Sequence, residues 1–152
     1  MYEVYFFLLL LLFLNSCKND DNRELDCSTA LCQANFAALY VEFIDRENDE
    51  NVLDNGTYTI NDIDLEGSES VNFEIDNTLD KQYLVITDSI WEIGSYEYSL
   101  TIGNTNEFKF VLNLERSGGE GCCSNILIAK TLEVNGDSKE VEFDPIISVF
   151  VE

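Results

Sequence analysis

The chain has 152 residues, with 30 Asp and Glu against 8 Lys and Arg, a formal net charge of −22 and no histidine. A nucleic-acid-binding protein needs clustered cations to neutralise phosphates, so this balance excludes nucleic acid as a partner. The absence of His excludes Ser-His-Asp and Cys-His nucleophiles and every His-ligated zinc site. Acid–base chemistry would therefore depend on carboxylate, Tyr, Lys or Cys side chains.

Residues 1–16 form an apolar segment that predicts a signal peptide. The apolar stretch from Val4 to Leu14 is shorter than the about 20 residues that a membrane-spanning helix needs. It fits the hydrophobic region of a secretory signal, although no basic residue precedes it as is usual. Leu14-Asn15-Ser16-Cys17 then resembles a bacterial lipobox. The resemblance implies cleavage before Cys17 and acylation of Cys17, and two or three acyl chains would anchor the protein stably in a membrane.

Residues 17–34 are predicted to be the lipidated Cys and a polar tether. The tether begins Lys18-Asn19-Asp20-Asp21 and is too polar to bury a core of its own. A Lys and acidic residues just after the lipidated Cys resemble the export signal of surface-exposed lipoproteins of the Bacteroidetes type. The resemblance implies an outer-membrane lipoprotein at the cell surface and specifies no molecular activity.

Four cysteines remain once Cys17 carries lipid, and in an exported protein an even number predicts two disulfides. A bridge between the adjacent Cys122 and Cys123 would be strained. We therefore favour two long bridges that join Cys27 and Cys32 to Cys122 and Cys123, with the connectivity open. The alternative is a zinc site with four cysteine ligands, but adjacent cysteines suit one tetrahedral ion poorly.

From residue 35 onward, apolar and polar residues alternate with the period of two that is typical of β-strands. Leu39, Val41 and Phe43 fall on one face of a strand, and Tyr98, Leu100 and Ile102 fall on one face of another. The pattern predicts strands near residues 36–45, 57–65, 70–76, 82–88, 96–103, 107–116, 125–134 and 140–151.

Turn signals separate these strands at the spacing of a β-sandwich. Asn135-Gly136 predicts a hairpin between the last two strands, and Pro145 marks an edge or a bulge in the last one. A short helical turn is expected within Thr29–Ala38. The sequence therefore predicts one domain over residues 35–152, an antiparallel β-sandwich of seven to eight strands that is Ig-like or transthyretin-like.

An acidic loop carries the one candidate metal site. Asp45, Glu47, Asp49 and Asp54 lie close together in the sequence, and Ca²⁺ prefers several oxygen ligands from such loops. The spacing does not match an EF-hand, and a solvated acidic turn is the simpler interpretation. We expect no cofactor unless calcium binds here.

Trp91 is the candidate ligand-binding residue, because it lies in a connection where an indole ring can stack on a sugar. Packing against the core is the alternative. Glu92, beside Trp91, is the one carboxylate with a bulky apolar neighbour, which matters for glycoside hydrolysis by paired carboxylates. The leading hypothesis is a non-catalytic, lipid-anchored envelope module that binds a protein, a glycan or a cation. The alternative is a small carboxylate-dependent hydrolase or accessory protein in polysaccharide breakdown.

Overall fold

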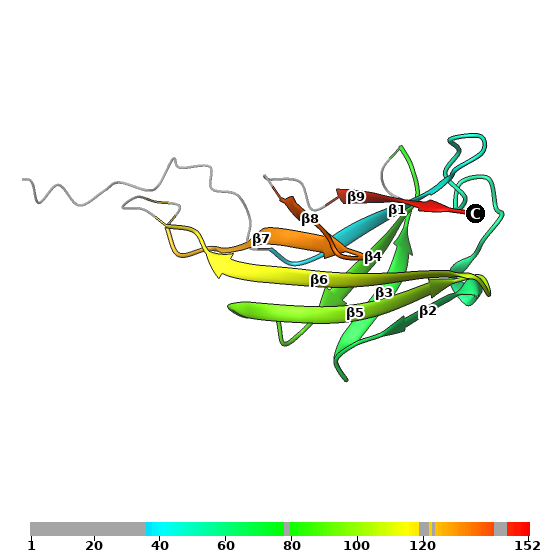
Figure 1. Ribbon diagram of the computed structural model, residues 1–152. Coiled ribbons are helices and arrows are strands. Elements are labelled where there is room, and N and C mark those ends of the chain that lie inside the picture. The colour runs from blue at the N-terminus through cyan, green and yellow to red at the C-terminus, as the bar shows by residue number, and fades with distance from the viewer. Residues whose placement is uncertain (1–35, 78–79, 119–121, 123, 142–145) are drawn as a thin grey trace, which may run out of the picture.

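The computed structural model describes residues 36–77, 80–118, 122, 124–141 and 146–152. These residues form two β-sheets packed face to face, so the predicted β-sandwich is confirmed (Figure 1). The predicted signal peptide, Cys17 and the tether lie outside the described residues, as do Pro145 and most of the expected helical turn.

The four-stranded sheet has the order β3-β4-β1-β9, and the five-stranded sheet has the order β2-β5-β6-β7-β8. The strands of the first sheet are β3 (Val71–Asp76), β4 (Tyr83–Asp88), β1 (Leu39–Asp45) and β9 (Ile146–Val151). Those of the second are β2 (Ile63–Glu66), β5 (Gly94–Ile102), β6 (Asn106–Arg116), β7 (Leu127–Val134) and β8 (Asp137–Glu140). A single 3-10 turn, η1 (Ile60–Asp62), precedes β2 within the described residues.

The core lies between the sheets and is built from the alternating apolar residues that the sequence predicts. Phe43 on β1 and Phe110 on β6 are completely buried, each from a different sheet. The predicted inward faces of β1 and β5 are confirmed, and burial of such side chains is the main source of stability. The buried set on these two strands is Leu39, Val41, Phe43, Tyr98, Leu100 and Ile102.

The prediction of one last strand over residues 140–151 is wrong, and the described residues form nine strands. Its two parts belong to different sheets, because β8 pairs with β7 and β9 pairs with β1. The predicted hairpin at Asn135-Gly136 is confirmed, and it joins β7 to β8. Both turn residues have positive φ, 53° and 92°, which matches the twist that a two-residue hairpin needs.

The fold is antiparallel as predicted except at one pair of strands, because β1 and β9 run parallel. Tyr40, near the start of β1, pairs with Ile146, the first residue of β9. β9 therefore starts beside the start of β1 and runs in the same direction. The predicted strand over residues 57–65 is also shorter, because Asp62 accepts hydrogen bonds from the Thr59 amide and hydroxyl and closes η1.

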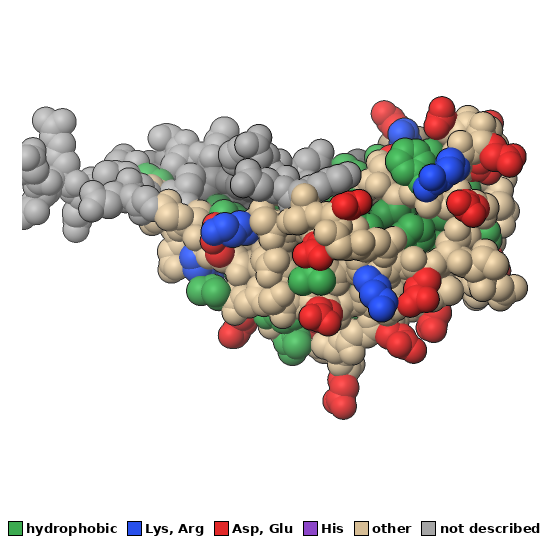
Figure 2. Space-filling view, viewed as in Figure 1, with side chains coloured by type: hydrophobic (Ala, Val, Ile, Leu, Met, Phe, Trp, Pro, Cys, Tyr) green, Lys and Arg blue, Asp and Glu red, His purple; other side chains and the backbone are tan. Residues whose placement is uncertain are grey.

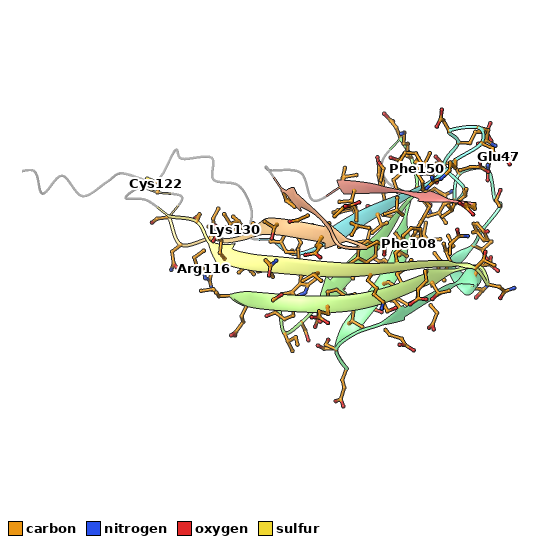
Figure 3. All side chains as sticks on the ribbon, viewed as in Figure 1. Glu47, Phe108, Arg116, Cys122, Lys130 and Phe150 are labelled. Atoms are coloured by element: carbon orange, nitrogen blue, oxygen red, sulfur yellow. The ribbon has the colours of Figure 1, made fainter. Side chains whose placement is uncertain are left out.

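The sandwich has two ends that carry different connections. The Phe36 end holds the first described residue, the β2–β3, β4–β5 and β6–β7 connections, and Arg116, Cys122 and Lys130 (Figure 3). The Glu152 end holds the long connection after β1 together with Glu47 and Phe150 (Figure 3). Carboxylate side chains are scattered over the visible face with few cations among them (Figure 2).

Gly67, directly after β2, provides a test of the packing between the sheets. A methyl group at this position would lie 2.4 Å from Cδ1 of the buried Tyr98 ring. We expect Gly67→Ala to lower the free energy of unfolding by about 1–3 kcal/mol, because such overpacking forces a shift of the ring or the backbone. Urea denaturation measures the change. Gly118→Ala is the control, since no described residue lies within 4 Å there, and equal losses for both variants would contradict the packing.

Candidate functional site

The strongest polar cluster surrounds Asp88, the last residue of β4, at the Phe36 end. Asp88 is 7% exposed and follows Leu84 and Ile86 on the inward face of the strand. Ser68 and Ser70, from the β2–β3 connection, each donate a hydroxyl hydrogen bond of 2.5 Å to its carboxylate. Tyr98, on β5, donates a third of 3.0 Å. The carboxylate therefore links a strand of one sheet to a strand of the other.

The bonds around Asp88 determine its charge state. Burial by itself would raise the pKa of the Asp88 carboxyl, but the hydrogen bonds that it accepts outweigh burial and hold its pKa below the ordinary value. These bonds include one from the Ile90 amide, 3.2 Å long. Burial raises the pKa of the Tyr98 hydroxyl, and the Asp88 carboxylate raises it further. The pair is therefore held as a carboxylate and a neutral phenol.

The β4–β5 connection, residues 89–93, is fixed by two tyrosines. The Trp91 indole Nε1 donates to the Tyr98 hydroxyl at 2.6 Å. The Tyr96 hydroxyl accepts from the Glu92 amide at 2.7 Å and donates to the Ile90 carbonyl at 3.1 Å. Side chains of β5 therefore hold the connection, together with one backbone hydrogen bond from the Trp91 amide to the Asp88 carbonyl at 3.3 Å.

The predicted ligand residue Trp91 is used mainly for packing. Its ring lies 5.0 Å from the ring of Phe36, centroid to centroid, and it packs against the core. With its N–H also engaged, the indole is not a free platform. The same connection instead exposes Ile90 and Ile93, which are 51% and 64% exposed. Sequence analysis missed these two side chains. Apolar residues on either side of a Trp in a short connection could have indicated an exposed apolar surface.

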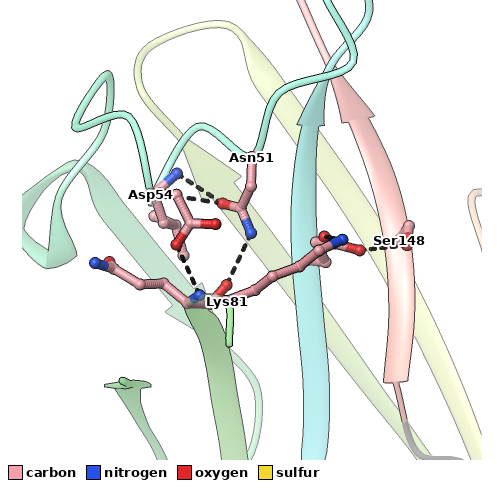
Figure 4. Close-up of polar contacts among 7 residues, drawn as sticks. Asn51, Asp54, Lys81 and Ser148 are labelled. Atoms are coloured by element: carbon pink, nitrogen blue, oxygen red, sulfur yellow. Dashed lines mark hydrogen bonds and ion pairs between the residues drawn. The ribbon is translucent and has the colours of Figure 1, made fainter. Parts of the chain in front are cut away.

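The predicted calcium residues take part in loop structure. Asp45 Oδ1 accepts a hydrogen bond from the Glu47 amide at 2.7 Å, and Asp54 Oδ1 accepts one from the Gln82 amide at 2.8 Å. Figure 4 shows Asp54 beside Asn51, whose side chain also bonds to the chain at Gln82. Among the described residues, no three His, Cys, Asp or Glu side chains lie close enough together to hold a metal ion. Calcium binding by Asp45, Glu47, Asp49 and Asp54 stays a prediction.

An ion pair between a buried carboxylate and an exposed lysine lies near this loop, on the outer face of the four-stranded sheet. Glu42, on β1, is 6% exposed and binds Lys81 Nζ at 2.6 Å. Its other carboxylate oxygen accepts a hydrogen bond of 3.0 Å from the Ser148 hydroxyl on β9 (Figure 4). The side chain therefore has a partner on each oxygen, which is what a buried carboxylate requires.

Among the cysteines, Cys122 forms a disulfide bond. Cys27, Cys32 and Cys123 lie outside the described residues, so the predicted pairing stays a prediction.

The Asp88 cluster suits a structural role better than acid–base catalysis. A carboxylate with a lowered pKa is a weak base, and its hydrogen bonds already occupy it. Within the described ranges, no helix is long and apolar enough to cross a membrane. No protein-family model matches the chain, and neither curated proteins nor solved structures give a match.

The pKa of Asp88 makes a prediction about stability and pH. Because this pKa is lower in the folded state than in the unfolded chain, Asp88 contributes stability that is present above about pH 4 and lost as the pH falls through the folded-state pKa. We expect Asp88→Asn to lower the free energy of unfolding at pH 7 by about 2–3 kcal/mol, because buried hydroxyls lose a charged acceptor. Urea denaturation at pH 7 and pH 3 should show a smaller difference at pH 3.

Asp62→Asn is the matched control for this prediction. Asp62 also accepts two hydrogen bonds and has a lowered pKa, caused first by the Thr59 hydroxyl, but it is exposed to solvent. Asp62→Asn should therefore lower the free energy of unfolding by clearly less than Asp88→Asn does. If Asp88→Asn lowers the free energy of unfolding equally at pH 7 and pH 3, the charge of Asp88 contributes nothing to stability.

Proposed function

We propose that the protein is a non-catalytic binding module that a lipid on Cys17 anchors at the cell envelope. The observation that carries this proposal is a contrast between buried polar groups and exposed apolar side chains. In the part of the chain that the structure describes, no buried side-chain nitrogen or oxygen lacks a hydrogen-bond partner. Ile90, Ile93 and Phe150 are nevertheless each half exposed or more. Ile90 and Ile93 belong to the same short connection, and apolar side chains grouped at one exposed place are typical of contact surfaces.

The shifted carboxylates support binding rather than glycoside hydrolysis. A glycosidase of the usual type needs a general acid whose pKa is raised by its surroundings. The pKa values of Asp62 and Asp88 both shift in the opposite direction. Glu92, which the sequence brings beside Trp91, is exposed to solvent.

The position of Phe36 supports the proposed anchor. Phe36 donates its amide to the Leu127 carbonyl at 2.7 Å and packs on Trp91, so the chain enters the sandwich at one end. Residues 18–35 would span at most about 60 Å if extended. A lipid on Cys17 would therefore attach the sandwich to the membrane through its Phe36 end and limit how far that end can lie from the membrane.

The anchor is tested by changing its attachment residue. Cys17→Ala should give an unlipidated form of higher mass that still carries residues 1–16, because signal cleavage in lipoproteins follows acylation. Intact-mass measurement and detergent partitioning report both changes. Cys122→Ala is the matched control and should leave acylation unchanged. An unchanged mass and membrane fraction for Cys17→Ala would contradict the anchor.

Surface display makes a separate prediction. Protease added to intact cells that produce the protein should remove it, and immunoblotting of the cells measures the loss. A periplasmic protein followed in the same samples should survive, which shows that the cells stay closed. Protection of the protein on intact cells, with digestion after lysis, would place it on the inner side of the outer membrane.

A further inference from the structure

We infer that the free edge of β9 binds an extended, positively charged polypeptide segment of another protein, which adds a strand to the four-stranded sheet. The inference goes beyond the proposed binding function and does not depend on the lipid anchor. It rests on three observations about β9: its unpaired backbone groups, the lack of charge on the strand, and the carboxylates near its end.

The backbone of β9 offers hydrogen-bonding groups without partners. The Val151 carbonyl accepts from the Arg46 amide, so the groups of Val151 point toward β1. Successive residues of a strand alternate in this direction, so the groups of Ser148 and Phe150 point away from β1. In the described chain, neither the N–H nor the C=O of Ser148 or Phe150 has a hydrogen-bond partner.

Glu152 is the next residue whose backbone groups point away from β1, and its hydrogen-bond partner shows how this edge can be paired. Glu152 donates its amide to Asn106 Oδ1 at 3.0 Å, and its carbonyl accepts from Asn106 Nδ2 at 3.3 Å. A side-chain amide from β6 thus pairs with the backbone of Glu152 as a neighbouring strand would. Asn106 closes the edge at Glu152 and leaves it open at Ser148 and Phe150.

The other three edges of the described sheets are protected in the usual ways, and β9 is not. Native edge strands are kept short or carry charges, which prevents pairing with other chains. β2 is four residues long and exposes Asp64 and Glu66, β8 is also four residues long, and β3 exposes Glu74. β9 has the sequence IISVFV, with no charge, and its Phe150 side chain is 50% exposed. An unprotected edge that is retained in a soluble domain is a site for strand addition.

The charges near β9 favour a basic partner over a second copy of the chain. Asp45 lies beside Val151 in the parallel ladder, and Glu47, Asp49 and Glu50 follow in the exposed loop. Arg46 is the one cation in this run, and its guanidinium lies 5.9 Å from the centre of the Phe150 ring. A second copy would bring another chain of net charge −22 to this end, whereas a strand with flanking Lys or Arg would be attracted.

The probe is the peptide Lys-Lys-Val-Thr-Ile-Thr-Val-Thr-Lys-Lys with blocked ends, and the protein is the full chain in a nonionic detergent. We expect saturable binding by isothermal titration calorimetry or fluorescence anisotropy. The same peptide with Glu in place of Lys should bind at least about tenfold more weakly at low salt, and the difference should shrink as salt screens the charges. An N-methylated form, which cannot pair as a strand, should not bind.

Ser148→Pro and Ser148→Ala form the matched pair of variants. Both remove the hydroxyl bond to Glu42, but only the proline removes the outward N–H, which an edge strand tolerates. Ser148→Pro should bind the basic peptide at least about tenfold more weakly than Ser148→Ala does. Circular dichroism and the thermal midpoint check that the two variants fold alike. Hydrogen exchange on the unmodified chain gives a second readout, since bound peptide should slow exchange of the Ser148 and Phe150 amides at least about tenfold.

Three results would overturn the inference. The first is equal binding by Ser148→Pro and Ser148→Ala without protection of the two amides, which would place the contact elsewhere. The second is no binding of either charged peptide. The third is sedimentation of the full chain as a dimer that Ser148→Pro converts to a monomer, which would make a second copy the occupant of the edge.

Discussion

The carboxylate of Asp88 is the interaction on which the rest of the sandwich depends. Two β-sheets in contact are held mainly by apolar side chains, which have no preferred direction and do not fix one sheet against the other. Asp88 adds directed bonds at one end, from the β2–β3 connection and from β5. The Tyr98 hydroxyl carries the network on to Trp91, whose ring contacts the residue at which the chain enters the sandwich. The Asp88 carboxylate thus joins β4 to the β2–β3 connection and to β5, and through Tyr98 to the β4–β5 connection.

The two outer faces of the sandwich differ in a way that suits one surface to solvent and the other to contact. The outward residues of the five-stranded sheet include exposed Glu97, Glu107 and Lys109. The outer face of the four-stranded sheet instead carries Tyr40 and Tyr83, whose rings lie 6.2 Å apart, and the buried Glu42, which is paired with Lys81. Charge keeps the first face hydrated. On the strands of the second face, the exposed charge is Glu74 of β3, at the edge opposite β9.

Sequence alternation was sufficient to predict the sandwich, the inward faces of its strands and the Asn135-Gly136 hairpin. These features depend on local periodicity and turn chemistry, which neighbouring residues carry. The parallel pairing of β1 with β9 and the division of the last strand depend on which sheet each segment joins, and no local pattern reports that. Asp88 was within reach of sequence reasoning, because it continues the inward series of Leu84 and Ile86, where a charged residue needs buried partners. Its donors, Ser68, Ser70 and Tyr98, come from two other segments and could not be identified.

The parallel pairing of β1 and β9 also affects when the domain can form. β1 is the first strand of the described chain, and its neighbour on one side is the last, with the Glu42–Ser148 bond joining residues 106 positions apart. Contacts of such long range are costly in chain entropy and form slowly. The four-stranded sheet cannot be completed until the C-terminal segment has left the ribosome. The first and last strands therefore cannot close the sandwich before synthesis of β9 is complete.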